Sequence, residues 1–170
     1  MRHTVELLVA AIMGFAPHAS AIGHSDFSGT WKMDPARSES AHQEIPVESS
    51  TLEIRVADNE VSVETTRSEG GKPDAFHERL TFRLDGTELT ETGQGGVQVK
   101  CRARWDGPKL VTETHRNVND STVSTLYVYM LSGDAGTMTV DQTLTVQHGY
   151  QGLNSKSSGH GRDVYVRVSK

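Results

Sequence analysis

The chain has 170 residues, a formal net charge of −5 and a single cysteine, Cys101. An acidic chain without a basic tract argues against nucleic-acid binding, because neutralisation of phosphates by Lys and Arg dominates that affinity. One cysteine excludes a disulfide within the chain. We interpret Cys101 as a buried, inert thiol, with a reactive thiol as the alternative.

The first residues are typical of a secretory signal peptide. Arg2 precedes an apolar run, Leu7 to Ala16, which is shorter than the roughly 20 residues that a membrane-spanning helix needs. Small residues suited to signal peptidase follow at Ala19-Ser20-Ala21. Glu6 is unusual in such a leader, so an uncleaved anchor is the alternative.

We therefore divide the chain into a signal peptide, residues 1–21, and one domain, residues 22–170. A domain of that size buries roughly 70% of its unfolded surface, so it needs no covalent staple to fold. No later stretch is apolar enough to span a membrane. We expect an exported protein, periplasmic or extracellular, without stable membrane insertion after cleavage.

Behind the leader, the periodic segments alternate between apolar and polar residues, as β-strands do. The clearest run, "TLEIRVADNEVSVETTR" at 51–67, has a turn at Asp58-Asn59 in its middle and predicts a hairpin. Later runs are separated by turns at Asp85-Gly86, at Asp106-Gly107-Pro108 and at 133–136, and the last run is Arg162 to Ser169.

These runs amount to nine or ten strands with short connections. Short connections force antiparallel neighbours, because a parallel crossover needs a dozen or more residues. A meander of this length hides its two edges by closing into a barrel. The sequence therefore predicts an all-β fold, an antiparallel up-and-down barrel of about eight to ten strands.

Two segments interrupt the alternation. Asp34 to Ser50 is polar and contains two prolines; it predicts a loop with a turn or two of helix near Ala36 to Ala41. We expect this loop to be the lid at the open end of the barrel. Gly149 to Gly161 is rich in Gly and Ser and predicts a mobile connection.

The opening "FSGTW", residues 27–31, resembles the Gly-x-Trp start of the calycins, the superfamily of lipocalins and fatty-acid-binding proteins. The resemblance implies a structural closure of the barrel. Gly29 lets the first strand bend, Trp31 fills the floor, and Arg167 matches the late Arg that packs over this Trp in calycins. The longer start "FSGTWKMDPARSES" is similar to exported bacterial lipocalin-like proteins without an assigned activity.

The chain departs from the fatty-acid-binding proteins at two points. Those proteins carry two helices between their first two strands, where this chain has the proline-containing loop. Their carboxylate-binding Arg-x-Tyr in the last strand is also absent. Tyr165 and Arg167 hold the same residue types in reversed order.

A barrel of this strand number is wide enough to enclose a ligand cavity. We expect the apolar strand faces to line it, with a core filled by the same side chains as the alternative. The candidate ligand-binding residues on these faces are Leu52, Ile54, Phe76, Leu80, Phe82, Val99, Tyr127, Tyr129, Val140 and Leu144.

The last strand has two possible orientations. If Val164, Val166 and Val168 point inward, Arg167 lies outside or at the rim, where it stacks on Trp31. If Tyr165 and Arg167 point inward, they join the candidate ligand-binding residues as donors to a ligand carboxylate. We favour the first orientation, in which Arg167 has the structural role of stacking on Trp31.

Other chemistries receive little support. Two rows of basic residues (Lys100, Arg102, Arg104 and His77, Arg79, Arg83) lie opposite apolar faces, so we expect them outside and paired with carboxylates. The histidines lack metal-ligand spacing, no nucleophile elbow occurs, and no cofactor is indicated.

We therefore predict a non-enzymatic, exported barrel that binds a small hydrophobic or amphipathic molecule, lipid or fatty-acid-like, in its interior. The alternative is a filled barrel that serves as an interaction module for an envelope protein partner.

Overall fold

The computed structural model describes residues 25–149 and 155–170, so the expected signal peptide lies outside the described residues. The described chain is almost entirely β-structure. No helix in it is long and apolar enough to cross a membrane. The strands are β1 (Gly29–Met33), β2 (Val47–Ala57), β3 (Glu60–Glu69), β4 (Lys72–Arg83), β5 (Leu89–Thr92), β6 (Gln98–Asp106), β7 (Lys109–Val118), β8 (Ser121–Leu131), β9 (Thr137–His148) and β10 (Lys156–Ser169).

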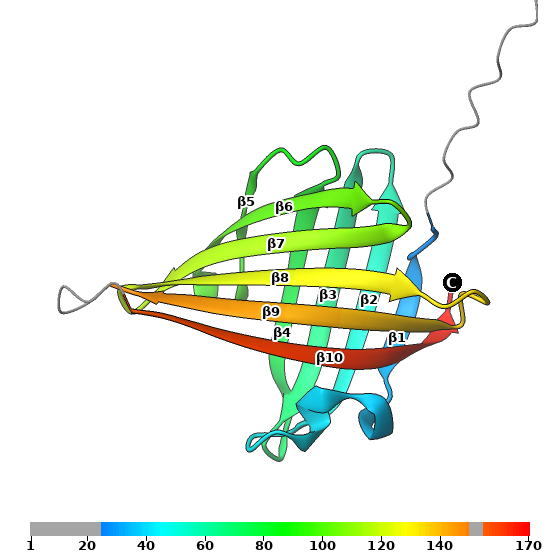
Figure 1. The fold of residues 1–170 in the computed structure, drawn as a ribbon, viewed down its shortest axis with the longest axis horizontal. Helices are drawn as coiled ribbons and strands as arrows, with labels where there is room; N and C mark the ends of the chain where they lie inside the picture. The colour runs from blue at the N-terminus through cyan, green and yellow to red at the C-terminus, as the bar shows by residue number, and fades with distance from the viewer. Residues whose placement is uncertain (1–24, 150–154) are drawn as a thin grey trace, which may run out of the picture.

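All ten strands form one antiparallel sheet in the order β4-β3-β2-β1-β10-β9-β8-β7-β6-β5. The first strand pairs with both β2 and the last strand, β10, which rolls the sheet on itself. Figure 1 shows the result: β2–β4 run steeply behind β6–β10, and the two sets enclose an interior. The predicted up-and-down barrel is confirmed.

The barrel is nearly closed, with a seam between β4 and the β5–β6 pair. A single isolated bridge, Asp85 with Arg104, joins the two edges within the described residues. Near the start of β4, away from this bridge, a 3-10 turn at Gln94–Gly96 crosses the seam: the Gln94 side chain donates to the Ala75 carbonyl at 3.2 Å. Side chains therefore close the seam where backbone pairing stops.

The other two 3-10 turns, Pro35–Arg37 and Glu39–His42, lie in the predicted lid loop, at the base of the barrel in Figure 1. The second turn is fastened to β10, because the Ser40 amide donates to Asp163 at 3.0 Å and Glu39 accepts from the Arg162 amide at 3.0 Å. The loop thus packs beside the interior at the end of the barrel away from Trp31.

The start of β10 corrects the sequence analysis. Lys156 to Gly161, expected to be a mobile connection, pairs with β9 in regular register from Gln147 to Gln142. Glycine and serine disfavour strands only weakly, and β9 supplies the backbone partners. As a result the ends of β8, β9 and β10 project from the barrel as an arm (Figure 1).

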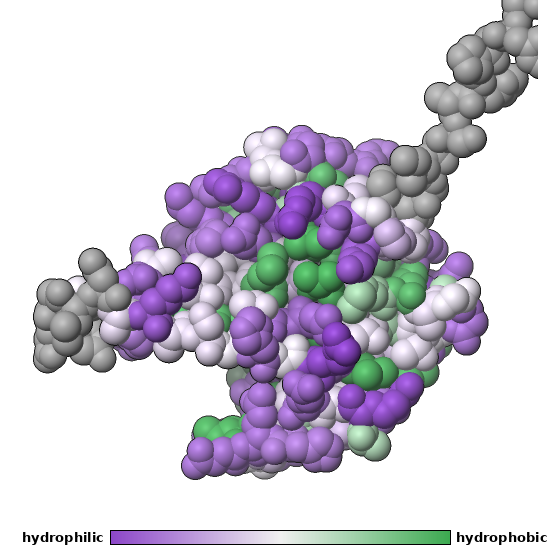
Figure 2. Space-filling model, in the orientation of Figure 1, coloured by the Kyte–Doolittle hydropathy of each residue, from purple (hydrophilic) through white to green (hydrophobic). Residues whose placement is uncertain are grey.

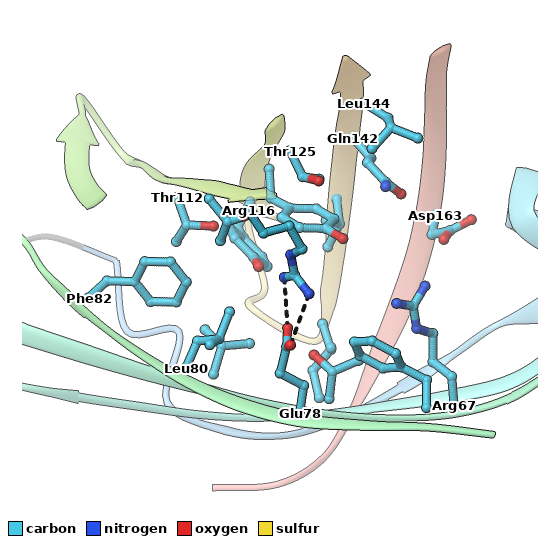
Figure 3. A pocket seen from close by; sticks show the side chains of 18 of the residues that line it. Arg67, Glu78, Leu80, Phe82, Thr112, Arg116, Thr125, Gln142, Leu144 and Asp163 are labelled. Carbon is cyan, nitrogen blue, oxygen red and sulfur yellow. Dashed lines mark hydrogen bonds and ion pairs between the residues drawn. The ribbon is translucent and has the colours of Figure 1, made fainter. Parts of the chain in front are cut away.

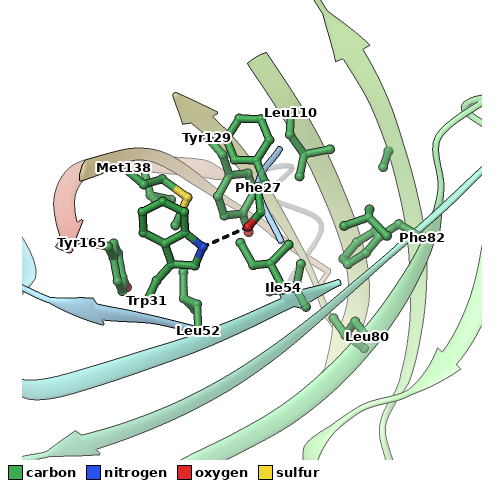
Figure 4. Packing of buried hydrophobic residues seen from close by; sticks show 14 of the residues in the cluster. Phe27, Trp31, Leu52, Ile54, Leu80, Phe82, Leu110, Tyr129, Met138 and Tyr165 are labelled. Carbon is green, nitrogen blue, oxygen red and sulfur yellow. Dashed lines mark hydrogen bonds between the residues drawn. The ribbon is translucent and has the colours of Figure 1, made fainter. Parts of the chain in front are cut away.

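The end of the barrel at Trp31 is packed solid. Trp31 and Phe27 are completely buried, and the indole Nε1 donates to the Phe27 carbonyl at 2.9 Å. The Arg167 guanidinium lies 4.1 Å from the Trp31 ring centroid. Figure 4 shows the indole among the side chains of β2, β8, β9 and β10, including Leu52, Tyr129 and Met138. This cluster is the floor that the Gly-x-Trp opening indicated.

The orientation of β10 is the reverse of the one we favoured. Tyr165 is buried, whereas Val166 and Val168 are 41% and 56% exposed. The reason is register: Arg167 is the cross-strand partner of Trp31 and Tyr165 that of Met33, and direct partners share a face of the sheet. Because the indole must point inward, Arg167 and Tyr165 do too, and the valines point outward.

Gly29 has a conformation that only glycine adopts without strain. Its φ is +133°, and a Cβ there would stand 2.3 Å from the Ser169 carbonyl oxygen, which is backbone. We expect Gly29→Ala to lower the free energy of unfolding by about 2 kcal/mol. Urea unfolding followed by tryptophan fluorescence measures this. Gly133→Ala, where a Cβ meets no atom within 4 Å, is the matched control, and an equal loss in both variants would contradict the assignment.

Candidate functional site

The barrel interior holds a cavity of about 270 Å³. Side chains from both crossing sets of strands line it, on β2–β4 from one side and on β7–β10 from the other. The alternative, a core filled by the same side chains, is therefore wrong for the part of the interior that holds this cavity. At about 30 Å³ per water molecule, the cavity has room for about nine water-sized groups.

The apolar wall of the cavity contains most of the residues that the sequence predicted. Leu80 and Phe82 on β4 are buried at its inner end (Figure 3), where the barrel narrows toward the Trp31 floor. Leu144 on β9 is 36% exposed and marks the outer end. The predicted residues that line the cavity are Leu52, Phe76, Leu80, Phe82, Tyr127, Tyr129, Val140, Leu144 and Tyr165.

Three predicted residues do not line it. Ile54 is buried one step farther along β2, opposite Gly29, in the packed floor. Arg167 lies over Trp31, and its Nε donates to the Ala135 carbonyl at 3.0 Å. Val99 is buried at the seam, where Gly93 lies close to it. The strand alternation placed all three on the inner face, but the inner face includes floor and seam as well as cavity.

A buried ion pair crosses the cavity wall at the seam. Arg116 on β7 donates from Nη1 and Nη2 to the two Glu78 oxygens, each at 3.0 Å (Figure 3). The Glu78 side chain is 6% exposed and also accepts from the Gln94 amide at 3.0 Å. Glu78 thus ties β4, β7 and the seam turn together, and its charge is fully engaged.

Arg67 on β3 is the cavity cation with fewer partners. Its guanidinium lies 4.4 Å from the Phe76 ring centroid. Its Nε is buried and makes no hydrogen bond within the described part of the chain; the nearest carboxylate oxygen, of Glu69, is 3.7 Å away. The buried Thr114 hydroxyl on the opposite wall likewise has no hydrogen-bond partner among residues 25–149 and 155–170. Both residues line the cavity.

The polar side of the cavity is completed by β9 and β10. Figure 3 shows Asp163, Gln142 and Leu144 on the same side of the cavity as the Arg67 guanidinium. The surface is hollowed on this side, between the β8–β10 arm and the base with the 3-10 turns (Figure 2). We take this side as the mouth.

Three tyrosines supply neutral hydroxyls. Burial raises the pKa of Tyr127, Tyr129 and Tyr165, so each remains protonated and able to donate. Tyr165 donates to the Ser50 hydroxyl at 3.1 Å. Burial is the largest cause of the raised pKa of Tyr127; the cations Arg67 and Arg116 lower this pKa and the anions Glu78 and Asp163 raise it.

The sequence analysis missed the charged lining. Arg67 follows Val61, Val63 and Thr65 at spacings of two, so the alternation already placed it on the inner face of β3. The same rule places Glu78 with Leu80, and Arg116 with Thr114. The signal was present, but the cost of burying charges argued against it until a partner for each was known.

The rows of cations that we expected outside do lie outside. Lys100 and Arg102 contact Glu88 at 3.1 and 2.7 Å, and His77 contacts Glu64 at 2.8 Å. Cys101 is buried, and burial raises the pKa of its thiol to about 12, so it is inert. No group of three or more His, Cys, Asp or Glu side chains in the described ranges is placed to hold a metal ion.

No family model and no curated protein matches the chain. Solved structures do match. The REP1-NXSQ fatty acid transporter is 15% identical with a TM-score of 0.53, over 83% of this chain and 95% of that one. Lipid binding protein 8 of Caenorhabditis elegans is 16% identical with a TM-score of 0.52, over 84% and 95%. A variant of the fluorescent protein UnaG is 21% identical with a TM-score of 0.52, over 85% and 97%.

Proposed function

Because this chain folds as a calycin-type β-barrel with a lined cavity, we propose that it is an exported protein that binds a small hydrophobic or amphipathic molecule, lipid or fatty-acid-like. The cavity is the observation that carries the proposal. The names of two similar structures, a fatty acid transporter and a lipid binding protein, support it. Export rests on the leader, residues 1–21, and on the likeness of the opening to exported bacterial proteins.

In this proposal the nine predicted lining residues supply the affinity and the protein performs no reaction. Each buried methylene contributes about 0.8 kcal/mol. A tail of about nine methylenes, the number of water-sized groups that fit, contributes about 7 kcal/mol, which corresponds to affinity approaching micromolar. Binding of a separate envelope partner remains a prediction.

The experiment is a titration of the purified domain with linear alcohols, using displacement of the neutral fluorophore N-phenyl-1-naphthylamine. We expect the dissociation constant to fall about fourfold per added methylene, the equivalent of about 0.8 kcal/mol, up to about ten carbons, where the cavity is full. Native mass spectrometry should show one bound molecule per chain.

Leu80→Asn is the matched test inside the cavity and Val166→Asn the control outside it. The first should weaken decanol binding about tenfold, because it places an amide in the apolar end. The second should leave binding unchanged. Absence of fluorophore binding, or a dissociation constant independent of chain length, would refute the proposed function.

A further inference from the structure

The charges that line the cavity sum to zero. Two are positive, Arg67 and Arg116, and two are negative, Glu78 and Asp163. Arg116 and Glu78 neutralise each other through two hydrogen bonds. The two charged side chains that remain in the lining are Arg67, which also has the Glu69 carboxylate 3.7 Å from its Nε, and Asp163.

These two side chains lie apart. Figure 3 shows Arg67 and Asp163 on the same side of the cavity, but among the described residues the ion-pair contact of Arg67 is with Glu69, 3.7 Å from its Nε, and not with Asp163. Asp163 comes from β10 and is held there by the Ser40 amide on one oxygen, Oδ1. Arg67 comes from β3, is held over Phe76 and has a buried Nε without a hydrogen bond. Each charge is fixed by its own strand.

A pair of fixed, opposite, separated charges discriminates among polar end-groups. A guest with one negative charge gains from Arg67 but is repelled by Asp163 and by Glu69, whose side chain is 34% exposed. A guest with one positive charge is attracted by Asp163 but repelled by Arg67. Binding of either guest gives the low-dielectric cavity a net charge, which costs free energy. A guest with both charges satisfies both side chains, and the summed charge of the lining and the guest remains zero.

From this geometry we infer that the cavity selects amphipaths with a zwitterionic end-group over those with a single charge. The apolar tail lies between Leu80 and Phe82 at the inner end. The negative group lies at Arg67 and the positive group at Asp163, beside the Gln142 amide. This inference rests on the proposed function and specifies its ligand class.

The test is a competition series with one decyl tail and four end-groups. The wild-type domain is loaded with N-phenyl-1-naphthylamine, and decanol, decanoate, decylammonium and the carboxybetaine N-decyl-N,N-dimethylglycine displace it at neutral pH, below their micellar concentrations. We expect the betaine to bind about tenfold more tightly than decanoate or decylammonium, one tenfold step being about 1.4 kcal/mol. Decanol, which satisfies neither charge, should bind less tightly than the betaine.

Two variants assign the effect to residues. Asp163→Asn keeps an oxygen for the Ser40 amide but removes the charge, so decanoate should tighten about tenfold and the betaine should weaken. Arg67→Gln removes the positive charge, so decylammonium should bind about tenfold more tightly and the betaine should bind more weakly. Asp141→Asn on the outer face of β9, where Asp141 contacts Arg162, is the matched control and should leave the order unchanged.

The outcomes separate the two proposals. If decanol and the fluorophore bind but decanoate equals or exceeds the betaine, or if Asp163→Asn leaves their ratio unchanged, the zwitterion inference is wrong and the binding function stands. If neither the fluorophore nor decanol binds, both proposals fall. Preference for the betaine that is lost in both variants and kept in Asp141→Asn supports the inference.

Discussion

Replacing Trp31 by alanine is expected to lower the free energy of unfolding by about 4 kcal/mol, the cost of truncating a fully buried aromatic. The indole is completely buried, donates to the Phe27 carbonyl and lies under the Arg167 guanidinium. The substitution therefore opens a void at the floor and removes the donor to the Phe27 carbonyl, whereas Arg167 keeps the Ala135, Ser28 and Asp26 carbonyls as acceptors. Equilibrium urea unfolding followed by circular dichroism measures the loss.

Two further variants divide this effect. Trp31→Phe keeps most of the ring but loses the hydrogen bond, so about half of the stability should return. Val168→Ala on the exposed face of β10 should change the free energy of unfolding by less than about 0.5 kcal/mol. A Trp31→Ala domain as stable as the Val168→Ala domain would show that the floor is not the main closure of the barrel.

Breaking the buried ion pair is the second large effect. We expect Arg116→Met to cost about 3 kcal/mol, because it leaves Glu78 as a buried carboxylate with only the Gln94 amide as partner. Glu78→Gln should cost somewhat less, since its amide oxygen still accepts from Gln94. Both losses are measured by urea unfolding at neutral pH.

The double variant distinguishes an ion pair from general packing. Glu78→Gln combined with Arg116→Met removes both charges, so it should be more stable than Arg116→Met alone by about 2 kcal/mol. Arg162→Met, which breaks the exposed contact with Asp141, should cost less than about 1 kcal/mol. If the losses of the two single variants simply add, Glu78 and Arg116 do not stabilise the barrel as a pair.

Much of the fold was predictable because the alternation is local. Leu52 on β2 and Phe82 on β4 belong to period-two runs bounded by turn residues, and both face the interior. The Gly-x-Trp opening indicated the floor, since only a glycine fits the bend at Gly29 and only a large side chain fills the space at Trp31. Nine of the twelve candidate ligand-binding residues line the cavity.

The orientation of β10 was not predictable in the same way. Both of its faces carry residues that suit an interior, Tyr165 on one side and Val166 on the other, so composition favoured the valines. Pairing with β1 reversed that preference, because Arg167 is opposite Trp31 and must share its face. A strand whose two faces are equally plausible takes its orientation from its neighbour.

Residue order by itself predicted an antiparallel barrel, because hydrophobic alternation and turn residues act between close neighbours in sequence, and the resemblance of its opening to the calycins implied the Trp floor. Only the tertiary structure decided what the interior contains. Arg67, Glu78, Arg116 and Asp163 come from four different strands, and the rolled sheet brings them to one cavity, where Arg116 pairs with the buried Glu78. That pairing depends on distances across the barrel, which no local pattern encodes.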